Sequence, residues 1–302
     1  MLRFEELVKV RVGRAVNRNL GEGLLLSGGL DSSIIAATAL QKPVAFTVTL
    51  EDFGTDLRFA KLVAEFLDLK LHVRKVTVDE AMKSIPEVIR VLKTFDPAIP
   101  NDLATYFGLK HSISYGCESI MTGDGCDELF AGYDYMHNMD LEEYIPEIVK
   151  SMSFNSNILG KYLSLKVKQP FLDQELIEFS LGIDPKLKVK EIDGVKWGKW
   201  ILRESFKHQL PEEIIWRRKT PIEAGSGFTK LREIVEKQVA DGDLDSYPIK
   251  FVSREHIYYY KIYMREVGYI PEPRGSDKRC LYCGAGVPAY SRHCRICGAY
   301  PT

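Results

Sequence analysis

The chain has 302 residues, of which 45% are hydrophobic and 27% charged, a composition typical of a globular protein and not of a disordered or fibrous one. Its 41 basic and 42 acidic side chains nearly cancel, so overall charge gives no reason to expect a nucleic-acid or membrane partner. Residues 1–20 place charges between apolar residues at helical spacing, unlike a signal peptide, and no apolar run reaches the roughly 18 residues of a membrane span. We therefore expect a cytoplasmic protein.

Short apolar runs alternate with longer amphipathic ones from Gly23 to about Ile120. The short runs predict strands at 24–26, 44–50, 70–78 and 118–123, and the longer ones predict helices at 31–40, 55–69, 80–95 and 102–116. This alternation is typical of an α/β fold with a doubly wound parallel sheet.

Beyond Gly132 the pattern predicts helices without clear strands, at 141–152, 173–182, 196–210, 228–243 and 254–268. We expect these helices to form a layer packed on the sheet. A tyrosine run in the last of them is compatible with a base-stacking platform, but core and interface contacts are favoured. Residues 271–279 are rich in Pro, Gly and charge and predict a linker, so we divide the chain into domains 1–270 and 271–302.

The segment SGGLDSS, residues 27–33, joins the first predicted strand to a helix. Backbone amides at such a turn converge on an anion, and two glycines allow it to approach closely. The segment is neither a Walker loop nor a dinucleotide loop, and Asp31 stands where a Walker loop has a cation. A carboxylate beside phosphates is explained by a divalent cation between them, which indicates Mg²⁺-pyrophosphate binding. The alternative is an ordinary turn capped by Asp31 or Ser32.

A second acidic segment, TGDGCDELFAGYDYM at 122–136, closes the fourth predicted strand. Its acidic residues lie between glycines at the carboxyl end of a parallel strand, where open sheets bind ligands. We expect Asp127 to share the cation with Asp31.

SGGLDSS resembles the pyrophosphate loop of the ATP pyrophosphatases, and among these it is most similar to the asparagine synthetase family. Residues 122–136 resemble the family signature SGEGSDEIFGGY, residues 166–188 the stretch containing VPFLD, and residues 199–228 the region from LRE to RxK. These four segments occur in the family's order and cover roughly residues 20–235.

The resemblance implies an adenine nucleotide alpha hydrolase-like fold and an amide-forming ligase. In that family ATP adenylates the β-carboxylate of aspartate, pyrophosphate leaves with Mg²⁺, and ammonia displaces AMP. Carried over by motif, the pyrophosphate ligands are Ser27, Gly28, Gly29, Asp31 and Ser32, the Mg²⁺ ligands are Asp31 and Asp127, and the adenosine contacts are Leu26, Val48, Thr122 and Gly123.

Lys219, in RRKTP, matches a family lysine that neutralises charge on the phosphates and the acyl adenylate. Without the resemblance, the same residue would be interpreted as a surface lysine in a basic run with Arg217 and Arg218.

Three features depart from the family. The synthetase segment begins about 25 residues into the chain and residue 2 is leucine, so we expect no glutaminase nucleophile here, and nitrogen from free ammonia or a separate glutaminase subunit. Asp124 replaces the glutamate of GEGSDE, which shortens the reach of a candidate general base. Asn101 stands where an arginine suited to an anionic substrate is expected, which weakens the inference to aspartate.

The last predicted module carries two Cys-x2-Cys pairs, separated by ten residues and each followed by glycine: Cys280, Cys283, Cys294 and Cys297. Two such pairs predict a structural zinc ribbon rather than a redox motif. Nearby basic residues are compatible with RNA docking, but a stabilising cap or a homodimer contact is favoured.

Two alternative functions stay open at this point. One is a tRNA-modifying enzyme that adenylates a base and inserts sulfur, since some pyrophosphate-loop enzymes of that class also carry zinc ribbons. The other is a non-catalytic module that binds a partner through its zinc ribbon. Release of AMP that requires tRNA and a sulfur donor would distinguish the first, and absence of nucleotide turnover the second.

Overall fold

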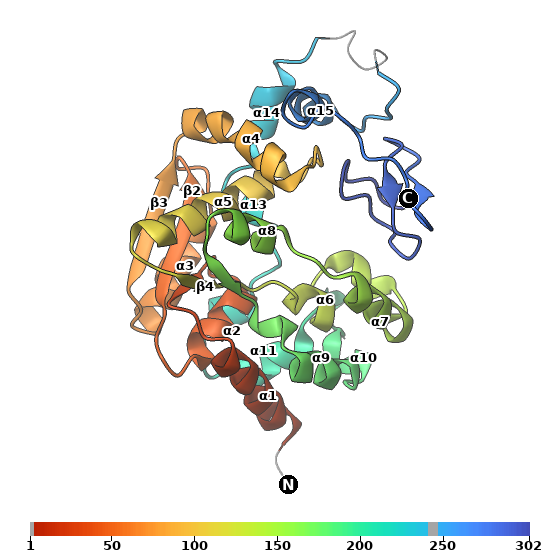
Figure 1. Cartoon of the computed structure of the whole chain (residues 1–302). Coiled ribbons are helices and arrows are strands. Elements are labelled where there is room, and N and C mark those ends of the chain that lie inside the picture. The colour runs from red at the N-terminus through yellow and green to blue at the C-terminus, as the bar shows by residue number, and fades with distance from the viewer. Residues whose placement is uncertain (1–2, 241–246) are drawn as a thin grey trace. The chain divides into compact units, whose positions relative to one another are not determined.

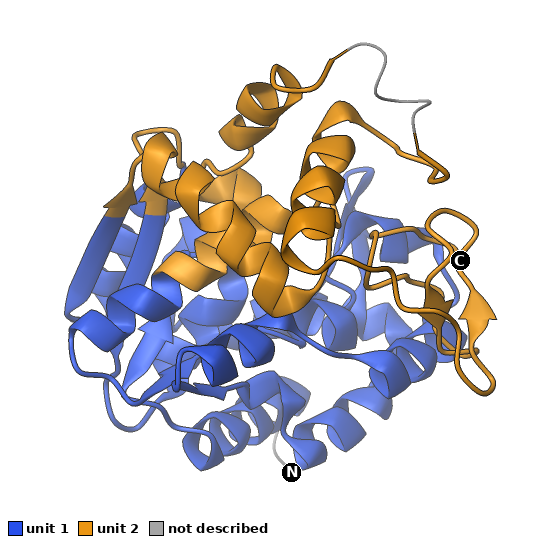
Figure 2. Ribbon diagram, turned by 45° about the horizontal axis from the view of Figure 1, so that its top comes forward, with its two compact units in different colours: residues 1–48, 55–74, 108–221 blue, residues 49–54, 75–107, 222–302 orange. Residues whose placement is uncertain are grey.

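The structure is a computed structural model that describes residues 3–240 and 247–302. The chain forms two compact units (Figure 2): unit 1 is residues 1–48, 55–74 and 108–221, and unit 2 is residues 49–54, 75–107 and 222–302. The predicted domain boundary at residue 270 is a different division and stays a prediction.

A five-stranded sheet has the order β3-β2-β1-β4-β5, with β1 (Gly23–Leu25), β2 (Val44–Leu50), β3 (Leu71–Val76), β4 (Ser119–Met121) and β5 (Lys166–Lys168). Strand β1 runs parallel to both β2 and β4, and β4 runs parallel to β5. The last residues of β2 and β3 belong to unit 2. This order confirms the doubly wound sheet and places the topological switch point between β1 and β4.

The sequence analysis missed β5. Its three residues, Lys-Val-Lys, form an edge strand that is only partly buried. An edge strand needs no continuous apolar run, so the hydrophobic pattern that revealed the other four strands is absent here.

The helices of unit 1 pack around its part of the sheet (Figure 1). Helix α1 (Phe4–Arg18) buries Val8, Val12 and Ala15 at helical spacing and packs against α2 (Leu30–Thr38), α9 (Gln174–Leu181) and α11 (Trp200–Phe206). The other helices that lie in unit 1 are α3 (Asp56–Phe66), α6 (Cys126–Phe130), α7 (Leu141–Ser151), α8 (Asn155–Tyr162), α10 (Pro185–Lys188) and α12 (Glu212–Ile215), with 3-10 turns η1 (Asp134–Asn138) and η2 (Pro170–Leu172). Helix α5 (Ile99–Ser114) begins in unit 2 and ends in unit 1.

The predicted helix 196–210 is wrong at its start. Residues Lys190–Ile192 (β6) and Val195–Trp197 (β7) form an antiparallel hairpin, and α11 begins only at Trp200. Between them, a Cβ on Gly198 would lie 2.0 Å from the Ala131 carbonyl oxygen, and Lys199 adopts the left-handed conformation with φ 55°. This tight approach of two backbones breaks the helical pattern.

Unit 2 contains α4 (Val78–Leu92), α13 (Ile222–Gly225), α14 (Lys230–Glu236), α15 (Arg254–Glu266) and the short strands β8 (Lys278–Arg279) and β9 (Gly286–Val287). A capping box of Thr77 and Glu80 starts α4, and α15 packs against both α4 and α14. The predicted helix 228–243 ends at Glu236, and its residues 241–243 lie outside the described ranges.

The tyrosine run of α15 is largely buried, with Tyr259, Tyr260 and Tyr263 all in the core. Tyr260 and Tyr263 contact the ring of Phe95, with centroids 5.2 and 5.1 Å apart. These side chains therefore serve core packing, as favoured above, and not base stacking.

Candidate active site and cysteine cluster

The loop after β1 is held in one conformation by its own polar groups. Gly28 has φ +68°, and a Cβ there would lie 2.3 Å from the Phe59 backbone, so only glycine fits. The hydroxyl of Ser33 donates a hydrogen bond to the Gly29 carbonyl (2.7 Å), and the Ser27 hydroxyl accepts one from the Gly29 N–H (3.2 Å).

The capping alternative for this loop is wrong. Gly29 is the N-cap residue of α2, and no side chain makes a capping hydrogen bond there. Asp31, in the first turn of α2, is instead paired with a distant lysine.

The loop after β4 lies directly against the loop after β1. A Cβ on Gly123 would be 3.0 Å from the Asp31 Cβ. Gly125 has φ +91° and is the N-cap residue of α6, whose second residue is Asp127. The two acidic segments thus meet at the switch point, as the sequence predicted.

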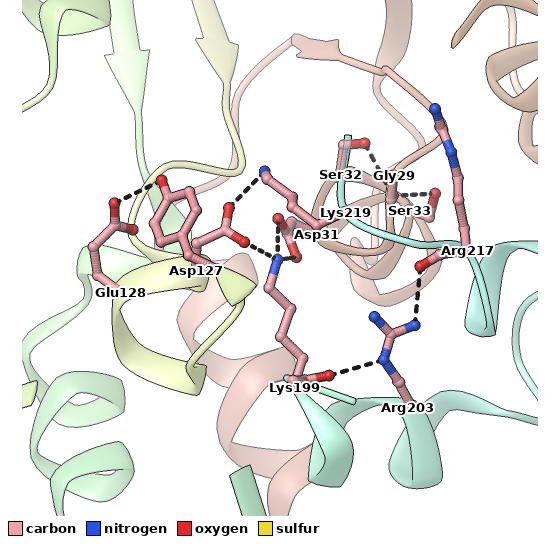
Figure 3. Close-up of polar contacts among 12 residues, drawn as sticks. Gly29, Asp31, Ser32, Ser33, Asp127, Glu128, Lys199, Arg203, Arg217 and Lys219 are labelled. Carbon is pink, nitrogen blue, oxygen red and sulfur yellow. Dashed lines mark hydrogen bonds and ion pairs between the residues drawn. The ribbon is translucent and has the colours of Figure 1, made fainter. Parts of the chain in front are cut away.

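Asp31 and Asp127 converge on one buried lysine that the sequence analysis missed (Figure 3). Lys199 Nζ lies 2.5 and 2.7 Å from the two carboxylate oxygens of Asp31 and 2.6 Å from Asp127 Oδ1. Its side chain is only 4% exposed. Lys219 Nζ donates to the other Asp127 oxygen, Oδ2, at 2.7 Å. Two carboxylates and two ammonium groups therefore form a compact, charge-balanced cluster.

These contacts favour the charged forms of Asp127, Lys199 and Lys219. Burial alone would raise the pKa of Asp127, but the charges and hydrogen bonds of Lys199 and Lys219 lower it to about 2. Burial acts to lower the pKa of Lys199, but Asp127 and Asp31 raise it above its ordinary value, and the pKa of Lys219 is raised in the same way. Both lysines are therefore protonated at neutral pH.

In the basic run 217–219, Arg217 holds the first loop in place, whereas Arg218 and Lys219 are exposed. Arg217 donates to the Ser27 carbonyl (3.1 Å) and to Asp56, and its guanidinium lies 3.8 Å from the centroid of the Phe59 ring. Arg203, on α11, donates to the Arg217 carbonyl at 3.2 Å. These bonds hold the segment so that Lys219 reaches Asp127.

Asp124 sits in a hydrogen-bond network of its own. Its Oδ2 accepts hydrogen bonds from the Thr122 hydroxyl (2.7 Å), the Ser156 hydroxyl (2.6 Å) and the Gln169 amide (2.8 Å). Three donors on one oxygen fix the orientation of a half-buried carboxylate. Ser156 and Gln169 were not singled out from the sequence, because only the fold brings α8 and the end of β5 to this loop.

Glu128 and Tyr133 form a second buried pair beside the cluster, with the Tyr133 hydroxyl donating to Glu128 Oε1 at 3.1 Å. Burial raises the pKa of Glu128 to about 7, and the neighbouring charge of Asp127 acts in the same direction. Glu128 therefore titrates near neutral pH.

The remaining predicted residues lie at the same ends of the strands. Leu26 follows β1, Val48 lies in β2, and Thr122 and Gly123 follow β4. Asn101 belongs to unit 2, in the first turn of α5, and is not placed relative to these residues.

The four predicted cysteines come together in unit 2. Their sulfur atoms all lie within 4.8 Å of one another, and all four residues are buried. The Cys280–Cys297 and Cys283–Cys294 sulfur pairs are each 3.7 Å apart, far beyond a disulfide bond. A tetrahedral metal with sulfur ligands at about 2.3 Å requires sulfur–sulfur edges of about 3.8 Å. The cluster therefore fits a four-thiolate metal site.

A family model described as Asparagine synthase matches residues 3–162 and 152–261. The chain belongs to the asparagine synthase family. Similar proteins include a probable glutamine-hydrolyzing asparagine synthetase of Dictyostelium discoideum, 32% identical over 256 residues, which are 72% of this chain and 46% of that protein. A glutamine-hydrolyzing asparagine synthetase of Lotus japonicus is 29% identical over 276 residues, 80% of this chain and 46% of that protein. The chain thus spans about half the length of these relatives.

Two solved structures show weak similarity. One is the U34-tRNA thiolase NcsA of Methanococcus maripaludis, 14% identical, with a TM-score of 0.32 over 93% of this chain and 85% of that chain. The other is a predicted subunit of a tRNA methyltransferase from Methanocaldococcus jannaschii, 15% identical, with a TM-score of 0.30 over 66% of this chain and 92% of that chain. TM-scores this low establish neither a shared fold nor a shared function. Within residues 3–240 and 247–302, no helix combines the length and apolar character needed to cross a bilayer.

Proposed function

We propose that the chain is an ATP-dependent, amide-forming ligase that activates a carboxylate as its adenylate and releases AMP and pyrophosphate. The observation that carries this proposal is the convergence of Asp31 and Asp127, from the loops after β1 and β4, on Lys199 and Lys219. Open α/β sheets bind ligands at this switch point.

In this proposal the loop after β1 holds the pyrophosphate, through Ser27, Gly28, Gly29 and Ser32. Asp31 and Asp127 would hold Mg²⁺, since paired carboxylates are its preferred protein ligands, and the bound metal would neutralise phosphate charge. Lys199 and Lys219 stay charged in the folded protein. They would donate to phosphate oxygens as negative charge develops, a contribution worth several kcal/mol for a preorganised cation.

Leu26, Val48, Thr122 and Gly123 are proposed to contact the adenosine. Leu26 and Thr122 are buried, directly after β1 and β4, and offer an apolar surface and polar groups beside the pyrophosphate loop.

Aspartate is the proposed acceptor and ammonia the proposed nucleophile. Asp124 is the candidate general base toward the incoming amine, since its Oδ2 is fixed by three donors. Within the described residues no contact is recorded for its Oδ1, which leaves that oxygen for a ligand. The ammonia would be free or would come from a separate glutaminase subunit.

Zinc is the proposed metal of the cysteine cluster. Four buried thiolates with 3.7 Å edges suit its tetrahedral geometry and leave no open position, so the proposed role is structural. The metal would supply much of the folding free energy of so short a segment.

The decisive experiment follows nucleotide products with ATP, Mg²⁺, ammonia and each amino acid in turn. The proposal expects equimolar AMP, pyrophosphate and asparagine when aspartate is present, and loss of all three in Asp31→Asn with an unchanged far-UV spectrum. Release of ADP, or turnover that ignores every carboxylate, contradicts it. AMP release that requires tRNA would support the alternative adenylating enzyme instead.

A further inference from the structure

Unit 1 contains a cavity of about 220 Å³ whose lining residues differ from those proposed for catalysis. It lies between α7 and the turn that joins α9 to α10. Its walls are mostly apolar side chains: Leu141, Ile145, Pro146, Leu181, Ile183 and Pro185. Glu142 and Asp184, both exposed, also line it.

One lining residue is a buried lysine. Lys188, the last residue of α10, is only 2% exposed. Within the part of the chain that the structure describes, no hydrogen bond or ion pair is recorded for its ammonium group. Burial alone lowers the pKa of Lys188 to about 8, with no neighbouring charge contributing.

A buried lysine without an ion pair is unusual, as a comparison of Lys188 with Lys199 shows. Lys199 is equally buried but contacts two carboxylates, and a buried charge is normally paired in this way. Within the described residues, neither lining carboxylate, Glu142 or Asp184, forms an ion pair with Lys188. Asp184 is the N-cap residue of α10 and accepts a hydrogen bond from the Lys186 N–H at 2.8 Å.

We propose that this cavity binds a small apolar carboxylate, whose anionic group pairs with Lys188 while its hydrocarbon part lies against Leu141, Ile145 and Ile183. The ligand supplies the missing counter-charge. A volume of about 220 Å³ is below the ~300–1,000 Å³ of drug-sized sites, so the ligand is a short aliphatic acid rather than a nucleotide.

The site is independent of the proposed reaction. None of its lining residues contributes to the Asp31–Lys199–Asp127 cluster. Two of the lining residues, Leu141 and Ile145, belong to the same small core cluster as Ala131, which directly follows α6.

The test measures binding by calorimetry and thermal shift on the full chain, with 4-methylpentanoate and hexanoate as probes. The matching amides, 4-methylpentanamide and hexanamide, are the uncharged controls. We expect the acids to raise the melting temperature and the amides to bind at least about tenfold more weakly, because they lack the charge-assisted bond. Equal binding of acid and amide, or no binding of any probe, overturns the proposal.

Two cavity variants and two control variants locate the site. Lys188→Met keeps the apolar stem and should weaken binding of the acids at least about tenfold, whereas Lys186→Met on the exposed side of α10 should not. Leu181→Phe keeps the Lys188 charge but narrows the cavity, so it should also weaken binding and covers the case in which Lys188→Met fails to fold. Binding in Asp31→Asn should match the unmodified chain. Unchanged affinity in both cavity variants overturns the proposal, whatever the outcome for ATP turnover.

Discussion

Lys199 supplies the positive charge that balances two neighbouring carboxylates in the candidate active site. Asp31 and Asp127 lie close enough to share one ammonium group, so without a cation between them their charges would repel in a buried setting. Lysine supplies that cation in the ligand-free chain. Lys219 adds a second positive charge on the outer oxygen of Asp127.

Lys199→Met should therefore destabilise the protein by about 3–5 kcal/mol, because it leaves the partly buried Asp31 without its cation and Asp127 with Lys219 alone. Mg²⁺ should restore more stability to this variant than to the unmodified chain, since the metal can replace the lost cation. Urea unfolding with and without Mg²⁺ measures both effects.

The control for this variant is Lys207→Met, which removes an exposed lysine paired with Glu204 and should cost under about 1 kcal/mol. A loss of similar size in the two variants would contradict the role assigned to Lys199.

Glu128 predicts a pH dependence of stability. Its pKa is 4.5 when unperturbed and about 7 in the folded protein, so the folded state holds a proton that the unfolded state has lost. The stabilisation that this bound proton gives the folded state is complete below pH 4.5. It is lost as pH rises through 7, which lowers the free energy of unfolding by about 3 kcal/mol.

Glu128→Gln keeps an acceptor for the Tyr133 hydroxyl and removes this titration. The difference in unfolding free energy between the two proteins should change by about 3 kcal/mol between pH 4.5 and pH 8. A constant difference across this range would show that Glu128 is ionised throughout. Histidines titrate equally in both proteins and cancel.

At the scale of elements, glycines let the loops of unit 1 approach closely. A Cβ at Gly132, just after α6, would lie 2.0 Å from Asp127 Oδ1 and 2.3 Å from Lys199 Cε. The Asp127–Lys199 contact exists only because this position has no side chain.

Gly132→Ala should displace Asp127 and reduce AMP release at least about a hundredfold, since small misplacements of reacting groups have effects of this size. Gly13→Ala is the control, because nothing lies within 4 Å of a Cβ there, and within α1 it should stabilise the chain by about 0.5–1 kcal/mol. Steady-state AMP release and thermal melting separate the two outcomes. Full activity of Gly132→Ala would mean that the cluster is not needed in this geometry.

The cysteine segment is joined to one loop of unit 2. The Phe95 N–H and the Thr94 hydroxyl both donate to the Ile296 carbonyl, at 2.8 and 3.2 Å. The His293 ring lies 3.3 Å from Asp96, and a Cβ on Gly298 would be 2.5 Å from the Asp96 carboxyl group. The cysteine cluster therefore supports the loop that precedes α5.

Removal of the proposed metal with a chelator should increase hydrogen exchange at the Phe95 amide at least about tenfold, because the acceptor of that amide lies within the cysteine segment. Amides of β1 and β4, in unit 1, should change little. Equal acceleration in both units would mean that the metal stabilises the whole chain and not this loop.

At the scale of the whole molecule, the proposed ligands should stabilise the fold by linkage. ATP with Mg²⁺ at 100 times its dissociation constant adds about 2.7 kcal/mol to the unfolding free energy. Calorimetric melting should show this shift in the unmodified chain and lose it in Asp31→Asn. A shift of equal size in that variant would place the nucleotide elsewhere.

The sequence predicted much of the fold because its elements are internally consistent. Strands β1, β2 and β4 carry apolar runs, and helices α1, α3 and α4 carry amphipathic spacing, so local pattern and final structure agree in these elements. The edge strand β5 and the break before α11 were not predicted, since one has no apolar run and the other depends on contact between Gly198 and Ala131.

The candidate site also contains residues that the sequence predicted and residues that it did not. SGGLDSS and the two cysteine pairs are contiguous motifs, and the structure brings Asp31 to Asp127 and the four sulfur atoms together as expected. Lys199, Gln169 and Lys188 carry no such signal, because nothing in a local segment distinguishes a buried lysine or glutamine from an exposed one.

The sequence by itself thus determined the doubly wound sheet, the SGGLDSS loop after β1, the acidic segment after β4 and the four-cysteine cluster, since each depends on residues close along the chain. Only the tertiary structure decided what balances these charges. Lys199 reaches across 168 residues to Asp31, and Gln169 reaches across 45 to Asp124. Lys188 is buried, and among residues 3–240 and 247–302 no carboxylate pairs with it. Burial and pairing are properties of the packed chain, because each depends on which distant segments surround a side chain.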